Sequence, residues 1–298
     1  MKKSLFLGIL GSFFFAFTFV LNRSMNLAGG YWMWGAVLRY LFTLPLMFLL
    51  LIKGEKFKPV LSDIKANPGA WLLWSTVGFG LFYAPLTMAS TFAESWFTAS
   101  VWQFTIVAGI LLTPVFGKKI PVKNLLLSCL ILAGIFVMQI PEIAKSHQTS
   151  IVLPLLMIMI AAFSYPLGNR KMMQVCADQF TAIQRVFGMT LCSIPFWLLC
   201  GVFAYSKAGL PSGGQTLQSF LVALFSGVIA TVLFFGATDM VKDNARQLAV
   251  IEATQSGEVI FTLLLGVLVL HDNMPPVTSF IGIILIVTGM ILNSLASS

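Results

Sequence analysis

The chain has 298 residues, of which 58% are hydrophobic and only 9% are charged. Soluble domains carry roughly 25% charged residues, so this composition excludes a water-soluble globular protein. The net charge of +8 would also suit a nucleic-acid-binding protein. In a membrane protein, however, Lys and Arg gather in cytoplasmic loops, and we therefore expect an integral membrane protein with no nucleic-acid partner.

Apolar runs fill the chain from end to end, and each is close to the roughly 20 residues that a helix needs to cross a bilayer. Short polar or Pro/Gly-rich breaks separate them, and no break is long enough to divide soluble domains. The pattern predicts an all-α membrane protein with ten transmembrane helices. They are expected at about 5–23, 32–52, 70–90, 96–115, 122–141, 151–169, 183–205, 219–238, 247–270 and 277–295.

The basic residues predict the orientation of these helices. Most of the 18 Lys and Arg residues fall in alternate breaks, chiefly at 53–65, 118–123, 170–171 and 242–246, and at the N-terminus. Short cytoplasmic loops are enriched in Lys and Arg. We therefore expect a multi-pass protein of the bacterial inner or plasma membrane, with both termini in the cytoplasm.

The two halves of the sequence resemble each other. Residues 17–23 are similar to residues 163–170, and Arg39 in the second apolar run has a counterpart, Arg185, in the seventh. Each half holds an odd number of predicted helices, so the second half would enter the membrane upside down relative to the first. Inverted repeats of this kind are typical of alternating-access transporters. The two predicted five-helix repeats are residues 1–146 and residues 147–298.

The ninth run carries polar groups that are costly in a membrane. Glu252, Gln255 and Glu258 fall within one arc at about 100° per residue, with the two carboxylates roughly 9 Å apart along the helix axis. An ionisable group in the hydrocarbon costs about 2.5–3.5 kcal/mol, which points to a helix lining a wet cavity. Glu258 is the first candidate for proton and substrate coupling and Glu252 the second. Because Glu252 lies near the expected cytoplasmic end, solvation or pairing with Arg246 is an equally open interpretation.

Other candidates lie outside the ninth run. The fourth run offers Gln103 and Trp102 but no central carboxylate. Tyr83, Tyr165 and Trp102 could hold an organic cation beside a carboxylate, although packing between helices is the competing role for each.

Arg39 and Arg185 could bind an anionic substrate, or they could pair with carboxylates or extend to the membrane surface. No nucleophile–base pair, phosphate-binding loop or metal-ligand motif is present in the sequence. We therefore expect no enzyme activity, no metal and no cofactor.

Two stretches carry a resemblance to a known family. Residues 101–111 (VWQFTIVAGIL) and 252–259 (EATQSGEV) are similar to signature stretches of the putative multidrug resistance efflux transporter family. This family lies in the EamA-like branch of the drug/metabolite transporter superfamily, and the likeness extends over essentially the whole chain. The resemblance implies a cavity between helices one, three and four and their counterparts six, eight and nine.

Together these observations predict a secondary active transporter that exports lipophilic cations or amines by alternating access, with protons as the coupling ion. An amino-acid or other small-metabolite exporter is the close alternative, and it would need Arg39 or Arg185 in or near the site. A lipid-linked carrier flippase is an alternative of another class and should show a polar groove open sideways to lipid. A structural membrane subunit would tolerate Glu258→Gln.

The expected partners are a small-molecule substrate, protons and membrane lipid, and the chain could be a monomer or a homodimer.

Overall fold

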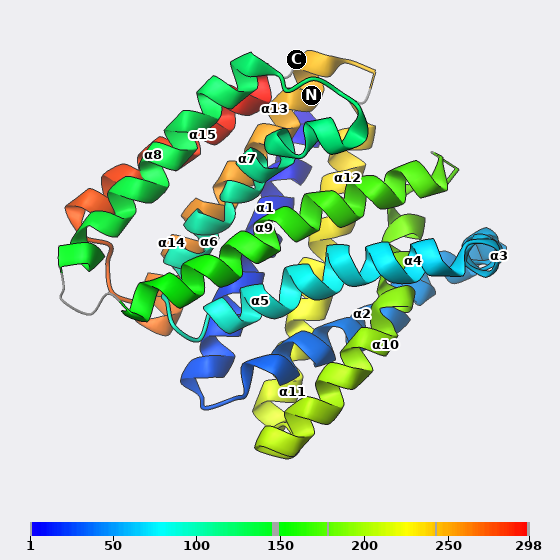
Figure 1. Ribbon diagram of the computed structural model, residues 1–298. Helices are drawn as coiled ribbons and strands as arrows, with labels where there is room; N and C mark the ends of the chain where they lie inside the picture. Colours follow the sequence, from blue (N-terminus) through cyan, green and yellow to red (C-terminus); the bar gives the residue numbers. More distant parts are fainter. Residues whose placement is uncertain (1, 145–148, 178, 242, 297–298) are drawn as a thin grey trace.

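The computed structural model describes residues 2–144, 149–177, 179–241 and 243–296 (Figure 1). Within these residues every regular element is helical. In lipid no water is available to hydrogen-bond the backbone, and a helix pairs its own amide and carbonyl groups. The prediction of an all-α protein is therefore confirmed for the described part of the chain.

Several helices run without interruption through the bundle, and they agree closely with the predicted apolar runs. The second run, predicted at 32–52, coincides with its helix, and the tenth differs by one residue at its end. The unbroken helices are α1 (Lys2–Leu27), α2 (Trp32–Ile52), α8 (Val122–Ala144), α9 (Thr149–Cys176), α10 (Ala182–Ala208) and α15 (Val277–Ala296).

The other predicted spans are built from consecutive pieces. Two contain a π-helical segment, and two are broken near the middle. The third is α4 (Pro68–Ser75), a π segment (Thr76–Gly80) and α5 (Leu81–Ala89), and the fourth is α6 (Ser95–Trp102) and α7 (Phe104–Leu111). The eighth is α11 (Gly213–Val222), a π segment (Ala223–Ala230) and α12 (Thr231–Asp239), and the ninth is α13 (Ala245–Ala253), a 3-10 turn (Thr254–Ser256) and α14 (Gly257–Leu270).

The charged stretch between the second and third runs is not wholly a loop. It contains α3 (Lys58–Ala66), a short helix at the edge of the bundle that starts with Pro59 in its first turn and buries Val60 (Figure 1). Short 3-10 turns also lie at Lys53–Glu55 and Thr113–Phe116.

Eight helices in the described residues are long and apolar enough to cross a membrane, and Ser95–Leu111 and Val122–Met138 are shorter apolar helices. Length and composition thus identify a multi-pass membrane protein. The count of ten spans and their division into inverted repeats are compatible with this arrangement and remain predictions.

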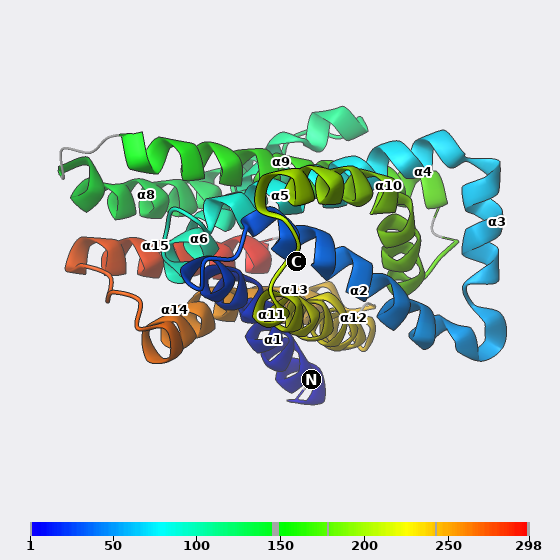
Figure 2. The ribbon, with the colours of Figure 1, turned by 90° about the horizontal axis from the view of Figure 1, so that it is seen from below.

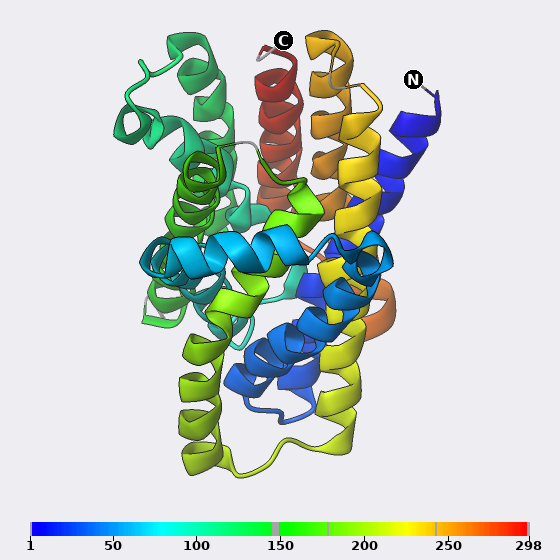
Figure 3. The same cartoon turned by 90° about the vertical axis from the view of Figure 1, so that its right-hand side faces the viewer.

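Helix α1 passes through the middle of the bundle and contacts α2, α6 and the elements from α11 to α14. Seen from below, α8, α9 and α4 lie along one side of the molecule, and α14, α1 and α12 lie along the other (Figure 2). Both termini are at the same end of the bundle, called here the terminal face (Figure 3). The connection between α10 and α11 lies at the other end, called here the opposite face (Figure 3).

Small residues let particular helices approach closely. Helix α9 crosses the first π segment at Gly168, where an added Cβ would lie 2.3 Å from the Cα and nitrogen of Gly78. Helices α8 and α15 pack side by side, and a Cβ on Gly134 would lie 2.6 Å from the carbonyl oxygen of Gly282. Glycine is needed at these positions because backbone meets backbone there.

Candidate functional site

Arg39, in the first half of α2, places its guanidinium inside the bundle. The group lies over the ring of Tyr83 at 4.0 Å from the ring centroid, within the range of a cation–π contact. Its Nη2 donates a hydrogen bond to Ser226 Oγ at 3.3 Å, and that hydroxyl also hydrogen-bonds Thr18 on α1. Its Nη1 is buried and has no hydrogen-bond partner.

Tyr83 joins Arg39 to α1. Its side chain is fully buried, and its hydroxyl oxygen accepts a hydrogen bond from Asn22 Nδ2 at 2.9 Å. The carbonyl oxygen of the Asn22 amide, Oδ1, is buried without a partner. Tyr40, one residue after Arg39, stacks on Trp197 with ring centroids 4.6 Å apart. Polar atoms from α1, α2, α5 and the second π segment therefore meet around one arginine.

Glu258, in the first turn of α14, forms the second part of this polar interior. Its carboxylate lies near the side chain of Gln103 and is close enough to Arg39 to interact with it electrostatically. The amide nitrogen of Gln103 donates a hydrogen bond to the carbonyl oxygen of Ala99 at 3.1 Å. Tyr165 is also within electrostatic range of both Glu258 and Arg39. No ion pair within 4.0 Å joins Arg39 to a carboxylate in the part of the chain that the structure describes.

The accessible surfaces of Glu258 and Tyr165 face the bundle interior. On α9 the outward side is marked by Leu156 and Ile160, both exposed. Tyr165 is five residues beyond Ile160, about 140° around the helix, yet 38% of it is exposed. Likewise Glu258 lies about 160° around α14 from the exposed Ile260. The interior beside these two side chains is therefore not fully packed.

Aromatic rings border this interior. Trp102 is buried, with its ring centroid 5.0 Å from that of Phe82 and 5.7 Å from that of Tyr165. Phe82 and Tyr165 are themselves 4.9 Å apart. Helices α5, α6 and α9 thus supply an aromatic wall next to the carboxylate of Glu258.

The remaining predicted site residues are Glu252, Gln255 and Arg185. Glu252 is exposed, and its predicted pairing with Arg246 falls outside the described side chains. Gln255 is half-buried in the 3-10 turn. Arg185 is half-buried in the first turn of α10 and, like Arg39, lies within electrostatic range of Tyr165. The two glutamates differ in exposure, since Glu252 is exposed and Glu258 is half-buried.

Sequence analysis did not single out three of the residues around Arg39, namely Thr18, Asn22 and Ser226. Each is a small polar residue within an apolar run, a signal too common in membrane helices to mark a site by itself. Asn22 lies in the stretch that suggested the internal repeat, but repeat similarity carried no information about its contacts.

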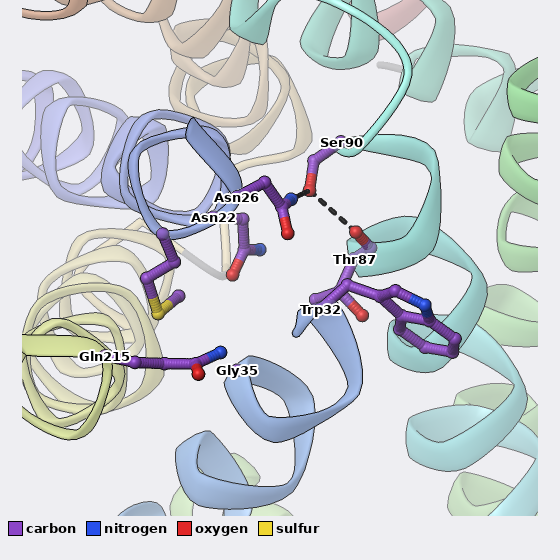
Figure 4. A pocket seen from close by; sticks show the side chains of 8 residues that line it. Asn22, Asn26, Trp32, Gly35, Thr87, Ser90 and Gln215 are labelled. Carbon is purple, nitrogen blue, oxygen red and sulfur yellow. Dashed lines mark hydrogen bonds between the residues drawn. The ribbon is translucent and has the colours of Figure 1, made fainter. Parts of the chain in front are cut away.

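A small recess opens next to Asn22, toward the opposite face (Figure 4). It is a shallow depression, and no charged side chain lines it. Asn26 Nδ2 donates to Ser90 Oγ at 2.7 Å across its edge, and Gln215 Nε2 donates to the carbonyl oxygen of Tyr31 at 2.8 Å. The lining residues are Asn22, Met25, Asn26, Trp32, Gly35, Thr87, Ser90 and Gln215.

The opposite face is tied together by a buried acidic group. Asp272, between α14 and α15, accepts hydrogen bonds from the backbone nitrogen of Ser95 at 3.1 Å and from its hydroxyl at 2.6 Å. Arg23 Nε, on α1, lies 3.8 Å from the other carboxylate oxygen. Trp96 Nε1 adds a hydrogen bond to the carbonyl oxygen of Asn273 at 3.1 Å. These contacts join α1, α6 and α14 at one end of the bundle.

Comparison with known proteins identifies the family. Residues 2–298 match the family described as EmrE, putative multidrug resistance efflux transporter. The chain belongs to this family. The family is one of transporters rather than enzymes, and it accounts for the multi-pass helical architecture.

Two relatives are similar over most of their length. The uncharacterized protein YjlA of Bacillus subtilis (strain 168) is 45% identical, with 99% of this chain and 95% of YjlA covered. An uncharacterized 42.1 kDa protein from the intracellular alkaline protease 3' region of Shouchella clausii is 41% identical, with 86% of this chain and 70% of that protein covered. A protein of known crystal structure shares the fold, with a TM-score of 0.66 at 14% identity, 100% of this chain and 98% of that chain being covered.

The two stretches that resemble the family signature meet in the structure. Residues 101–111 contain the break between α6 and α7 at Gln103, and residues 252–259 contain the 3-10 turn before α14. Gln103 of the first stretch lies near Glu258 of the second. Helix breaks leave backbone groups available for other partners, and they recur at functional sites in transporters.

Proposed function

We propose that this chain is a proton-coupled exporter of small organic amines and lipophilic cations that works by alternating access, with Glu258 as the coupling site. The observation that carries the proposal is the position of Glu258. It lies in the bundle interior, next to Gln103 and facing away from the lipid side of α14. Intramembrane carboxylates are costly and commonly mark proton and substrate pathways.

A single carboxylate can couple proton movement to substrate movement, because the proton and the substrate compete for binding to it. The ionised form of Glu258 attracts a protonated amine, and the protonated form releases it. The aromatic wall of Phe82, Trp102 and Tyr165 supplies ring faces for the apolar part and the charge of such a substrate. Membership in an efflux transporter family supports export as the direction of transport.

Corresponding irregularities in the two halves support alternating access. A π segment interrupts the third span at 76–80 and the eighth span at 223–230. The fourth span breaks at Gln103 and the ninth at 254–256. We propose on this basis that residues 1–146 and 147–298 are inverted repeats with the site at their interface, as in other transporters of this architecture.

The proposed orientation places the terminal face in the cytoplasm of a bacterial cell. Its support is the concentration of Lys and Arg at the N-terminus and in alternate breaks between the predicted spans, such as 53–65 and 118–123. The flippase alternative needs a polar groove open sideways to lipid. The accessible surfaces of Glu258 and Tyr165 face the interior of the bundle and not the lipid, which favours a transporter with an enclosed site.

The experiment uses purified protein in liposomes that contain a pH-sensitive dye. A panel of lipophilic cations, amines and amino acids is applied to wild type, Glu258→Gln and Glu252→Gln. Substrate-dependent proton movement is expected in wild type and in Glu252→Gln, and is expected to vanish in Glu258→Gln. Asp239→Asn, which changes an exposed carboxylate at the end of α12, is the matched control.

Proton movement that survives Glu258→Gln in folded protein would overturn Glu258 as the coupling site. Loss in Glu252→Gln alone would transfer the role to that residue. Absence of proton movement in wild type with every compound would refute proton-coupled amine transport.

A further inference from the structure

Arg39 is a half-buried cation inside the bundle. In the described part of the chain no carboxylate oxygen lies within 4.0 Å of it, and its hydrogen-bond partner is the neutral hydroxyl of Ser226. The Tyr83 ring covers one face of the guanidinium, while Nη1 has no partner. An unpaired charge is costly inside a membrane protein, so this donor is suited to an anionic group that arrives with a ligand.

An unsatisfied acceptor lies on the same tyrosine. Asn22 Oδ1 is buried without a partner, while the amide nitrogen of Asn22 is held by the Tyr83 hydroxyl. That hydrogen bond fixes the amide, so Oδ1 stays available next to the recess that its side chain lines (Figure 4). A donor without a partner, Arg39 Nη1, and an acceptor without a partner, Asn22 Oδ1, therefore belong to two residues that both contact Tyr83. The carboxylate of Glu258 is in electrostatic range of Arg39.

We propose that the central site takes a small zwitterion, whose anionic group binds Arg39 and whose ammonium binds Glu258 and Asn22. This inference rests on the proposed function and, among the substrates proposed there, favours amines that also carry an anionic group over purely cationic compounds. A guanidinium offers parallel donors that match a carboxylate, and its free edge here includes Nη1. A ligand that carries only positive charge would be attracted by Glu258 and repelled by Arg39, so the pair of charges selects molecules that carry both.

The aromatic wall extends the description of this ligand. Phe82, Trp102 and Tyr165 lie on the side of the interior next to Glu258. They would receive an apolar or aromatic side chain attached to the zwitterion. An amino acid with such a side chain would offer a carboxylate to Arg39, an ammonium to Glu258 and Asn22, and an apolar group to the aromatic wall. Binding of such a ligand would require Arg39.

The test compares ligands that differ in one charge. The standard amino acids with apolar and aromatic side chains are each measured with their methyl esters, which lack the anion, and their N-acetyl forms, which lack the ammonium. Binding to purified wild-type protein in detergent is followed by isothermal titration, so that the result does not depend on proton coupling. Tetraphenylphosphonium serves as the purely cationic probe. We expect the zwitterion to bind at least about 10-fold more tightly than either blocked form.

The variants assign the selectivity to Arg39. In Arg39→Gln the zwitterion should bind about 10- to 100-fold more weakly, as expected for one charge-assisted interaction, while the methyl ester binds as well as before or better. Arg39→Lys keeps the charge without the planar fork and should show a smaller loss. Lys207→Gln, which removes an exposed charge at the end of α10, is the control.

Three results would overturn the inference. They are failure of every zwitterion to bind at millimolar concentration, tighter binding of the esters than of the zwitterions, and equal weakening of both by Arg39→Gln. The last result would make Arg39 only a counter-ion for Glu258. These outcomes are distinct from failure of the proposed function, because amines or tetraphenylphosphonium would still drive proton movement in liposomes.

Discussion

Replacing Asp272 with Asn tests how the face opposite the termini is held closed. The Asp272 carboxylate is 3% exposed and accepts two hydrogen bonds from Ser95. Asn keeps the size and one acceptor oxygen but removes the charge. Because Ser95 begins α6 and Asp272 follows α14, the substitution weakens a contact that must open if substrate leaves through this face.

The magnitude follows from the two bonds to Ser95. A hydrogen bond to a charged group contributes about 1.5–3 kcal/mol, against about 0.5–1.5 kcal/mol for a neutral pair. Neutralising the acceptor of both bonds therefore costs about 2–3 kcal/mol. Arg23 Nε lies 3.8 Å from the carboxylate, beyond hydrogen-bond distance, and its contribution is not included in this energy. If the closed arrangement loses this energy and the open one does not, the open fraction rises about 30- to 150-fold.

The assay measures how often the face opens. A cysteine is placed at Ala93, which is buried next to this contact, in a background without the four native cysteines. The rate of its reaction with a charged maleimide in detergent should rise by the same factor in Asp272→Asn. Glu94→Gln is the control. Glu94 is adjacent to the reporter position, and its side chain makes no capping hydrogen bond to α6. An unchanged rate in Asp272→Asn, with a control that also reacts slowly, would refute the idea that this contact closes the face.

Two further predictions concern packing and the polar network. Gly168→Ala places a methyl group against the backbone of Gly78, which no rotamer change can relieve, and should lower the free energy of unfolding by about 1–3 kcal/mol in detergent. Gly236→Ala has open space around it and should be neutral or stabilising, so equal melting temperatures for the two variants would contradict the crossing geometry. Tyr83→Phe removes the hydroxyl that accepts from Asn22 and should cost about 1–3 kcal/mol, because the buried amide loses its partner. A melting temperature for Tyr83→Phe that equals wild type would show that this hydrogen bond contributes nothing.

Much of the architecture could be predicted because hydropathy is a property of local sequence. Apolar runs near 20 residues must become helices in lipid, since no other local structure satisfies their backbone. The predicted run at 32–52 therefore coincides with α2, and the run at 277–295 differs from α15 by one residue. The same reasoning found Glu258, because a carboxylate in an apolar run stands out.

The interruptions of the helices were not predictable in this way. A uniform 100° per residue was assumed for the ninth run, but the structure has a 3-10 turn at Thr254–Ser256 within it. The π segment at 223–230 is equally invisible in the apolar sequence. Such segments depend on which neighbouring side chains and backbone groups compensate for altered hydrogen bonds, and these neighbours come from other helices.

The sequence by itself determined that the chain is a helical membrane protein and where its helices lie, and it marked Glu258, Gln103 and Arg39 as unusual. Only the tertiary structure decided that these three lie near one another, that Glu252 is exposed, and that Arg185 shares Tyr165 with Arg39 as an electrostatic neighbour. The physical reason is that the transfer of a helix into lipid depends on the hydropathy of its own residues, which can be read along the chain. The pairing of charges is decided between helices, by packing that brings α2, α6 and α14 to one point.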